Sequence, residues 1–287
     1  MSIQAVVYRI IPPFFRKRIK QTYYAGRRFF TERIIEPTEV IVGLRDKLTP
    51  PRSKIFVGDG DFKAIGETFR QYFIDFCQLQ PDHAVLDVGC GIGRMAVPLT
   101  SYLSADGSYE GFDPVADGIH WCQQHITPRF PNFQFRQVNL FNGFYNPAGQ
   151  DQAITYRFPY NDDQFDTVVV VGVFTHMTIN EISTYLGEIK RVLKPGGRCL
   201  TSFFLLDNES RRLMVEPGSA FNFQYPFEGR WAFDPHNPNT GSAHDETELL
   251  RVMATHGLPV QRPIRYGSWS GRQPATSFLD IIILEKP

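Results

Sequence analysis

The stretch VLDVGCGIGR at residues 85–94 decides the fold of this chain of 287 residues. Its first four residues are mostly branched and apolar, which predicts a fully buried parallel strand, with Asp87 one residue before its end. The backbone can then turn sharply, with no side chain between it and a ligand, at Gly89, Gly91 and Gly93. We expect a helix over 94–103, and the free N–H groups at its start favour an anionic group. The pattern predicts a nucleotide-type cofactor loop at the carboxyl end of the first strand of an α/β sheet.

The spacing of these glycines separates two kinds of cofactor loop. The dinucleotide fingerprint is G-x-G-x-x-G, whereas residues 89–93 read G-x-G-x-G, and Arg94 stands where the third glycine would be. The pattern D-x-G-x-G-x-G after a hydrophobic strand resembles the first motif of the class I S-adenosylmethionine-dependent methyltransferases. The resemblance implies that the cofactor is bound by Asp87, Gly89, Cys90, Gly91 and Gly93. From this motif alone, a structural turn in another α/β fold is the alternative.

A second acidic residue follows at the spacing that a ribose contact requires. The segment SYEGFDP at 108–114 predicts a short strand, and its last residue, Asp113, can accept two hydrogen bonds from a ribose diol. The alternative is a helix cap, because Asp-Pro is a common helix start. A third strand is expected over 133–143, ending at Asn139 and Leu140. Similar methyltransferases use a polar residue and its apolar neighbour here to meet the adenine.

The stretch FDTVVVVGVFTHM at 165–177 predicts a central buried strand followed by a polar break. Gly172 is a further candidate cofactor contact, and Phe174 and His176 emerge at the carboxyl end, where an open α/β sheet binds its ligand. A helix over 179–193, the glycines of KPGG at 194–197 as its stop, and the strand RCLTSFFLL follow. This order of helix, LKPGG and strand resembles the same family, and the resemblance covers about 75–206.

The fold prediction is a three-layer, Rossmann-like α/β domain over 56–287 with a seven-stranded sheet. In the family resembled, the last strand is antiparallel to the others, and SFLDIIILE at 277–285 suits that place. Residues 207–247 interrupt the core with a polar, aromatic insertion that we expect to form a lid or a substrate wall, and a helix ending at Gly257 follows.

A helix is also expected ahead of the first strand, within 56–81, with Pro81 as its stop. In the family resembled, the loop that leads into such a helix often closes over the cofactor. Asp59, Asp61 and Phe62 are therefore candidate lid or cofactor contacts, although Phe62 suits the core equally well.

The N-terminal arm over 1–55 differs in charge from the rest of the chain. Residues 1–36 carry eight Lys or Arg and two Glu, so their balance is +6 in a chain that is neutral as a whole. An amphipathic helix is expected between Phe15 and Ile34. Such a basic helix can lie on an anionic membrane surface, and the alternative is that it packs on its own domain or on a second subunit.

Composition limits the remaining classes of function. Apolar residues make up 42% of the chain, and 25 of its residues are Phe, which suits a core and an apolar pocket. The neutral charge gives no reason to expect nucleic acid, and the four scattered cysteines and seven histidines show no metal-ligand spacing. We expect a cytoplasmic protein without a bound metal, in contact with membrane only through the arm, and an oligomer is compatible with this sequence.

Methyl transfer needs a nucleophile and an activated methyl group held in line, and a hydroxyl acceptor benefits from a base. His176 is the candidate base, because it follows the fourth strand and titrates near neutral pH. The alternative for His176 is a structural hydrogen bond or a substrate contact. His236 and His244 lie in the insertion and could enter the pocket. The candidate acceptor-binding residues are Phe174, Tyr266, Trp269 and Arg272, and the last three could instead form a structured turn.

The sequence therefore predicts an S-adenosylmethionine-dependent O-methyltransferase that acts on a small molecule, a glycan or a lipid-linked acceptor. An NAD-dependent oxidoreductase shares the logic of strand, loop and acid, but the glycine spacing and the antiparallel last strand argue against it. A non-catalytic interaction protein on the same fold is the other alternative. Nucleic-acid methylation ranks low, because VFTHM stands where an aromatic–proline catalytic tetrapeptide would follow the fourth strand.

Overall fold

The computed structural model describes residues 38, 46–58, 60–143 and 145–287. The chain divides into two units, residues 1–58 and residues 59–287. In the first unit the described part contains a short 3-10 helix, η2 (Arg52–Lys54). The amphipathic helix expected between Phe15 and Ile34 lies outside the described residues.

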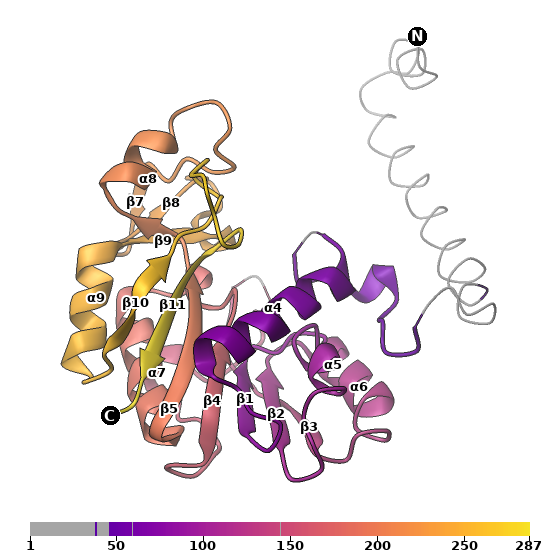
Figure 1. The fold of residues 1–287 in the computed structure, drawn as a ribbon. Helices are drawn as coiled ribbons and strands as arrows, with labels where there is room; N and C mark the ends of the chain where they lie inside the picture. Colours follow the sequence, from indigo (N-terminus) through magenta and orange to yellow (C-terminus); the bar gives the residue numbers. More distant parts are fainter. Residues whose placement is uncertain (1–37, 39–45, 59, 144) are drawn as a thin grey trace, which may run out of the picture. The chain divides into compact units, whose positions relative to one another are not determined.

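The second unit is built on a seven-stranded sheet, whose order is β10-β11-β5-β4-β1-β2-β3 (Figure 1). The strands are β1 (Ala84–Val88), β2 (Ser108–Asp113), β3 (Phe133–Gln137), β4 (Phe165–Val170), β5 (Leu193–Phe203), β10 (Val260–Arg265) and β11 (Asp280–Glu285). Strand β1 pairs in parallel with β2 and β4, whereas β11 is antiparallel to both β5 and β10. The predicted Rossmann-like sheet with an antiparallel last strand is confirmed.

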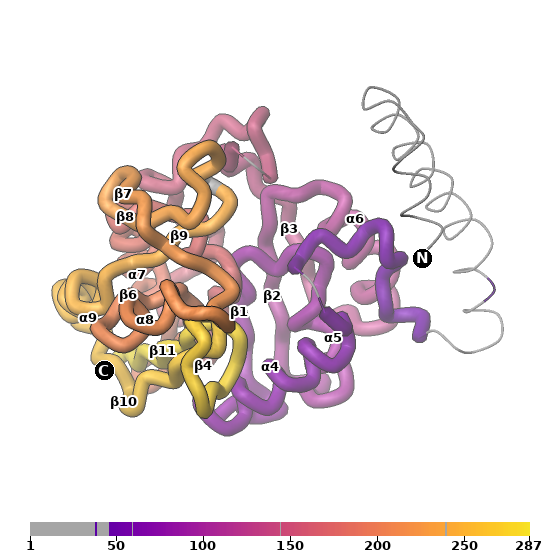
Figure 2. The backbone as a smooth tube through the Cα atoms, turned by 90° about the horizontal axis from the view of Figure 1, so that it is seen from above, coloured from indigo at the N-terminus to yellow at the C-terminus, as the bar shows by residue number. Residues whose placement is uncertain are grey.

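Helices cover both faces of this sheet (Figures 1 and 2). One face carries α4 (Phe62–Cys77), α5 (Ala96–Leu99) and α6 (Ala116–His125), and the other carries α7 (Ile179–Val192) and α9 (Glu246–Thr255). The main core lies between the sheet and α7 and α9, where Val168 and Val170 of β4 pack with Ile182 and Leu186 of α7. The apolar residues of the strands are buried under helices on both faces of the sheet. Polar side chains at the carboxyl ends of the strands are therefore the candidates for a functional role.

Three element boundaries differ from the sequence prediction. The helix after the glycine loop is only Ala96–Leu99, since Gly93 has φ +79° and Pro98 lacks the N–H that would extend a regular helix from Arg94. Helix α4 ends at Cys77, where Gln78 takes a left-handed conformation, and not at Pro81. Strand β3 ends at Gln137, before Asn139 and Leu140.

The KPGG segment also has a different role from the one expected. Helix α7 ends because Leu193 is extended (φ −68°, ψ 139°), so the glycines do not stop it. Lys194–Gly197 lie inside β5, where the register with β4 shifts between Phe165 and Thr167 and Gly196 has φ +78°. The glycines therefore permit an irregularity in a strand.

The insertion after β5 contains a second, four-stranded sheet with the order β6-β9-β8-β7. Its elements are β6 (Leu205–Leu206), α8 (Asn208–Leu213), β7 (Tyr225–Phe227), β8 (Arg230–Ala232), η5 (Pro238–Thr240) and β9 (Ser242–Asp245). An aromatic cluster of its own fills this part, with Phe204, Phe223 and Trp269 at its centre. The sequence predicted a lid or a substrate wall without indicating this sheet, and that role stays a prediction.

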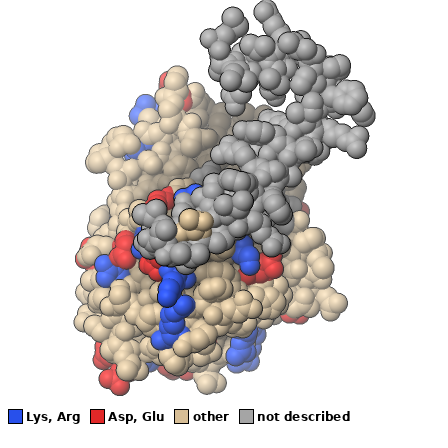
Figure 3. Space-filling view, turned by 90° about the vertical axis from the view of Figure 1, so that its right-hand side faces the viewer, with Lys and Arg blue, Asp and Glu red and all other residues tan. Residues whose placement is uncertain are grey.

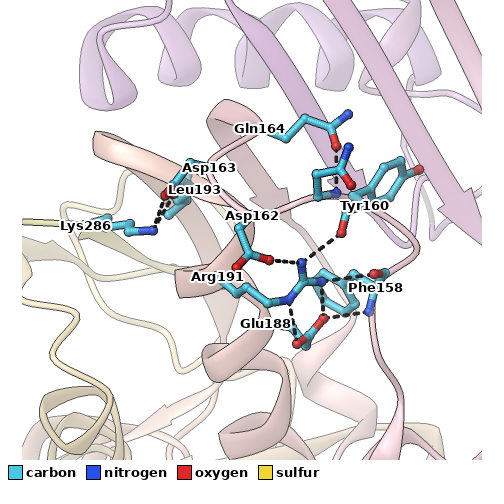
Figure 4. A network of polar contacts seen from close by, with 10 residues as sticks. Phe158, Tyr160, Asp162, Asp163, Gln164, Glu188, Arg191, Leu193 and Lys286 are labelled. Carbon is cyan, nitrogen blue, oxygen red and sulfur yellow. Dashed lines mark hydrogen bonds and ion pairs between the residues drawn. The ribbon is translucent and has the colours of Figure 1, made fainter.

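The amino ends of β4 and β5 are held by a polar network (Figure 4). The guanidinium of Arg191 donates to Glu188, to Asp162 and to the carbonyl oxygens of Phe158 and Tyr160, at 2.6–3.0 Å. These bonds raise the pKa of Arg191 and tie the loop before β4 to α7. The amino ends of these strands therefore have a structural role, and their carboxyl ends are where a ligand can bind.

Charged side chains of both signs are interspersed on the face of the second unit seen in Figure 3. Within the part of the chain that the structure describes, no helix is long and apolar enough to cross a membrane. The same residues contain no group of three or more His, Cys, Asp or Glu that could hold a metal ion. All four cysteines are buried and free.

Candidate donor and acceptor site

The glycine loop after β1 is tied to the end of β2. The N–H groups of Gly89 and Cys90 both donate to the carbonyl oxygen of Phe112, at 2.9 and 3.1 Å. Gly89 has φ +79°, and a Cβ on it would lie 2.3 Å from Cγ2 of Val173. Only glycine fits there, because both the backbone conformation and the neighbouring side chain exclude a larger residue.

Gly91 and Gly93 continue the loop toward α6 and the end of β2. Gly91 has φ +56°, and its N–H donates to Oδ2 of Asp113 at 2.9 Å. A Cβ on Gly93 would lie 2.9 Å from Sγ of Cys122 on α6. The loop is thus packed closely against α6 and hydrogen-bonded to the end of β2 at these two glycines.

Asp113 is buried at the end of β2 and accepts hydrogen bonds on both carboxylate oxygens. Oδ2 accepts from Gly91, and Oδ1 accepts from the N–H of Val115 at 2.8 Å. Burial raises the pKa of Asp113 to about 6, although the two N–H donors act in the opposite direction. Each oxygen keeps a further lone pair, so the carboxylate can still accept from a ribose diol. The helix-cap alternative holds only in part, since Asp113 bonds the residue before α6 and not its first turn.

Asp87 lies beneath the loop and is almost completely buried. The hydroxyl of Tyr109, on β2, donates to its Oδ2. Burial raises the pKa of Asp87 to about 7, the Tyr109 hydrogen bond lowers it, and the charge of Asp113 raises it further. Sequence reasoning found Asp87 but missed Tyr109, whose only signal was its position two residues into the second strand.

The turn after β4 provides open space. Gly172 has φ +73°, and its N–H donates to Oγ of Ser202 on β5 at 2.8 Å. A Cβ on Gly172 would meet no atom within 4 Å. The 3-10 helix η4 (Phe174–His176) follows, so His176 lies at the carboxyl end of β4 as predicted. Its half-buried ring meets the ring of Tyr145 edge-on, with centroids 5.4 Å apart.

Phe174 does not face this space. It is fully buried, its ring is stacked on Phe203 at 5.2 Å, and it also contacts Tyr185. The prediction that Phe174 binds the acceptor is therefore wrong, because an aromatic residue two positions before His176 on a tight helix points into the core.

The predicted acceptor wall near the C-terminus is a structural cluster. Trp269 is buried, and its Nε1–H donates to Oδ2 of Asp280 at 2.7 Å. Arg272 donates to both carboxylate oxygens of Asp207 at 2.7 Å and lies over the ring of Tyr266, 3.9 Å from its centroid. The polar groups of Trp269 and Arg272 already have protein partners, so both residues serve a structural role here, and their contact with an acceptor stays a prediction. The hydroxyl of Tyr266 donates to Glu246, so the structured-turn alternative holds for all three.

The remaining candidates fall in different places. Asp61 is the N-cap of α4, where it accepts the N–H of Ala64 at 2.7 Å, and its contact with the cofactor stays a prediction. Phe62 is buried, in agreement with its core alternative. Asp59 lies outside the described residues. Asn139 is exposed and Leu140 buried at the start of the loop after β3, and their contact with adenine stays a prediction.

Comparisons with known proteins agree with this geometry. Residues 85–197 match a family model described as a methyltransferase domain. Methyltransferase GfsG of Streptomyces halstedii is 26% identical over 133 residues, which cover 46% of this chain and 42% of that protein. The mitochondrial ubiquinone biosynthesis O-methyltransferase of Rattus norvegicus is 28% identical over 185 residues, 62% of this chain and 44% of that protein. The chain spans about half the length of the curated relatives it matches.

Solved structures share the fold. The PH0226 protein of Pyrococcus horikoshii OT3 matches with a TM-score of 0.55 and 16% identity, covering 82% of this chain and 95% of that chain. The family match over residues 85–197, the sheet order and the glycine loop support a class I S-adenosylmethionine-dependent methyltransferase. Its cofactor is S-adenosylmethionine, which decides against the dinucleotide alternative.

The residues present fit this cofactor. The glycine loop turns at three positive-φ glycines directly beside the end of β2, Asp113 keeps acceptor capacity for a diol, and a Cβ on Gly172 would meet no atom within 4 Å, so the turn before His176 leaves room. S-adenosylmethionine supplies an activated methyl group when bound. The loop from Gly89 to Gly93, Asp113 and the Gly172 turn would hold it, and the protein's part in methyl transfer would be to orient the reactants and exclude water.

Proposed function

We propose that this protein transfers the methyl group to a hydroxyl of a small-molecule, glycan or lipid-linked acceptor, with His176 as the base that takes the hydroxyl proton. The observation that supports this most is the position of His176, which η4 presents beside the open turn at Gly172. An imidazole there can accept a proton from an acceptor whose oxygen approaches the methyl group from the side of the insertion.

The relatives support an apolar or lipid-linked acceptor in a general way. One is named for O-methylation in ubiquinone biosynthesis, and others for methylation of 2-phytyl-1,4-naphthoquinone and of a sterol carbon. These acceptors differ in the methylated atom but share a large apolar body. The aromatic residues of the insertion are compatible with such an acceptor. We further propose that the basic N-terminal arm brings the protein to membranes where such acceptors reside.

The experiment is an acceptor screen in which purified protein and S-adenosylmethionine are incubated with hydroxylated quinone precursors, sterols and glycans. Turnover is measured as the release of S-adenosylhomocysteine. We expect product with wild type, and His176→Ala should lower turnover at least 100-fold while leaving donor affinity within a factor of two. His120→Ala, an exposed histidine on α6, is the matched control and should retain wild-type turnover. Unchanged turnover in His176→Ala would remove this residue from the role. Donor binding without any methylated product across the screen would favour a non-catalytic protein.

A further inference from the structure

The loop after β3 folds back on itself as a hairpin that presents Tyr145. The backbones of Asn142 and Asn146 exchange two hydrogen bonds, at 3.1 and 2.9 Å. The side chain of Asn142 accepts the N–H of Tyr145 at 2.9 Å, and the amide of Asn146 donates to the carbonyl oxygen of Leu140 at 2.9 Å. The position of Tyr145 is therefore set by the hairpin backbone and two asparagine side chains.

The base of this hairpin is fixed to the site. The N–H of Val138 donates to the carbonyl oxygen of Asp113 at 3.2 Å, and the N–H groups of Gln150 and Asp151 both donate to the carbonyl oxygen of Asn139 at 2.9 Å. The loop that carries the hairpin is thus hydrogen-bonded, at Val138, to the backbone of the residue that would bind the ribose.

The half-buried side chain of Tyr145 meets one group of the site directly. This group is the imidazole of His176, whose ring is perpendicular to that of Tyr145, at 88° with centroids 5.4 Å apart. Burial raises the pKa of the Tyr145 phenol first, and the charge of Asp113 raises it further. Tyr145 therefore packs against the helix after β4 from a loop that is hydrogen-bonded to the end of β2.

We propose that Tyr145 closes the donor site: it covers S-adenosylmethionine between Asp113 and His176, and its ring holds the imidazole of His176 in place. The covering role rests on the donor site, and the positioning role rests on the proposed function of His176. An aromatic ring suits both, because it has few rotamers to lose, excludes water and makes a favourable edge contact with a second ring.

The test for the covering role is calorimetric titration of the full chain with S-adenosylmethionine and with S-adenosylhomocysteine. Tyr145→Phe keeps the ring and should bind both within a factor of two of wild type. Tyr145→Ala should weaken binding about tenfold, which corresponds to about 1.4 kcal/mol. Tyr225→Ala, an exposed tyrosine of the insertion, is the control and should bind as wild type does. Wild-type affinity in Tyr145→Ala would overturn the covering role.

The positioning role has a spectroscopic test that needs no acceptor. The ring resonances of His176 in ¹H–¹³C spectra, assigned with His176→Asn, should shift in Tyr145→Ala and keep their wild-type positions in Tyr145→Phe. Tyr145→Leu replaces the alanine variant if that variant does not fold, and the same shift is expected. Unchanged His176 resonances would overturn the positioning role. By contrast, normal turnover in His176→Ala would show that His176 is not the base, and it would not affect the proposal that Tyr145 covers the donor.

Discussion

The imidazole of His244 donates from Nε2 to the carbonyl oxygen of Phe174 across 3.2 Å. His244 lies on β9 of the insertion, and Phe174 begins the helix that presents His176. Beside it, the hydroxyl of Ser242 donates to the carbonyl oxygen of Thr175 at 3.0 Å. Two side chains of the insertion therefore hold the backbone on which the candidate base stands.

His244 should make stability depend on pH. Burial lowers the pKa of His244 to about 4, and the Phe174 hydrogen bond opposes that shift. Since an unfolded histidine has a pKa of about 6.5, the unfolded chain binds the proton first as pH falls. The stabilising effect of a neutral His244 is thus complete above pH 6.5 and lost between about 6.5 and 4, by about 3 kcal/mol.

Urea unfolding of wild type and His244→Gln between pH 7.5 and 4 measures this effect. Glutamine retains an N–H donor and does not titrate, so the stability of wild type relative to this variant should fall with pH. The variant comparison is needed because the raised pKa values of the buried Asp113 and Asp280 give the opposite trend over about pH 4–6. A wild-type minus variant difference that stays constant over this range would show that His244 is not buried as a neutral group.

Asp113 should control donor affinity. Removing a carboxylate that accepts from a diol costs about 1.5–3 kcal/mol, so Asp113→Asn should weaken S-adenosylhomocysteine binding roughly 10- to 100-fold in calorimetry. In wild type, affinity should also decline as pH falls through about 6, because protonation removes the charge from the carboxylate. Asp117→Asn, exposed on α6, is the control. Equal affinities in the two variants would place the ribose elsewhere.

Two glycines of the site should respond differently to alanine. Both have positive φ, which costs alanine about 1–2 kcal/mol. At Gly89 the new Cβ would also meet Val173 at 2.3 Å, so Gly89→Ala should lower both stability and donor affinity. At Gly172 the Cβ would enter open space, so Gly172→Ala should lower donor affinity with only the backbone cost in stability. Thermal melts with and without S-adenosylhomocysteine separate the two effects. Ligand-induced stabilisation equal to that of wild type in Gly172→Ala would mean that the donor does not use this space.

How far the sequence could predict this site depends on how local each signal is. Asp87, the glycines and Asp113 lie at the ends of strands within one short segment, and the local pattern together with the family resemblance identifies them. The seven-stranded sheet with its antiparallel last strand followed from the resemblance. These parts of the prediction needed no knowledge of long-range packing.

The acceptor side could not be predicted in the same way. Trp269 and Arg272 look exposed in a loop sequence. In the structure, however, Trp269 donates to Asp280 and Arg272 donates to Asp207, and neither partner is a close neighbour in the sequence. Phe174 and His176 lie on the same short 3-10 helix, and the sequence does not show that their side chains point in different directions. Tyr145 left no signal at all, since its position depends on a hairpin closed by two asparagines.

Asp280 should stabilise the junction between the main sheet and the insertion, because its partners lie in β6, directly before the insertion, and in the segment between β10 and β11. Its carboxylate accepts the N–H groups of Leu205 and Gly267 and the indole N–H of Trp269, at 2.6–2.7 Å. Asp280→Ala leaves three buried donors without an acceptor, and each costs about 1–3 kcal/mol, so a loss on the order of 3 kcal/mol or more is expected in urea unfolding. Glu216→Gln, exposed in the same insertion, should stay within about 0.5 kcal/mol of wild type. A loss below about 1 kcal/mol in Asp280→Ala would contradict this role.

The atom that receives the methyl group tests the central proposal most directly. Wild type and His176→Ala are incubated with S-adenosylmethionine labelled with ¹³C at the methyl group and with the acceptor found in the screen, and the product is examined by NMR. We predict a methyl group bound to oxygen, formed by wild type and reduced at least 100-fold in the variant. A methyl group on carbon or nitrogen, or equal yields from the two proteins, would contradict O-methylation with His176 as the base.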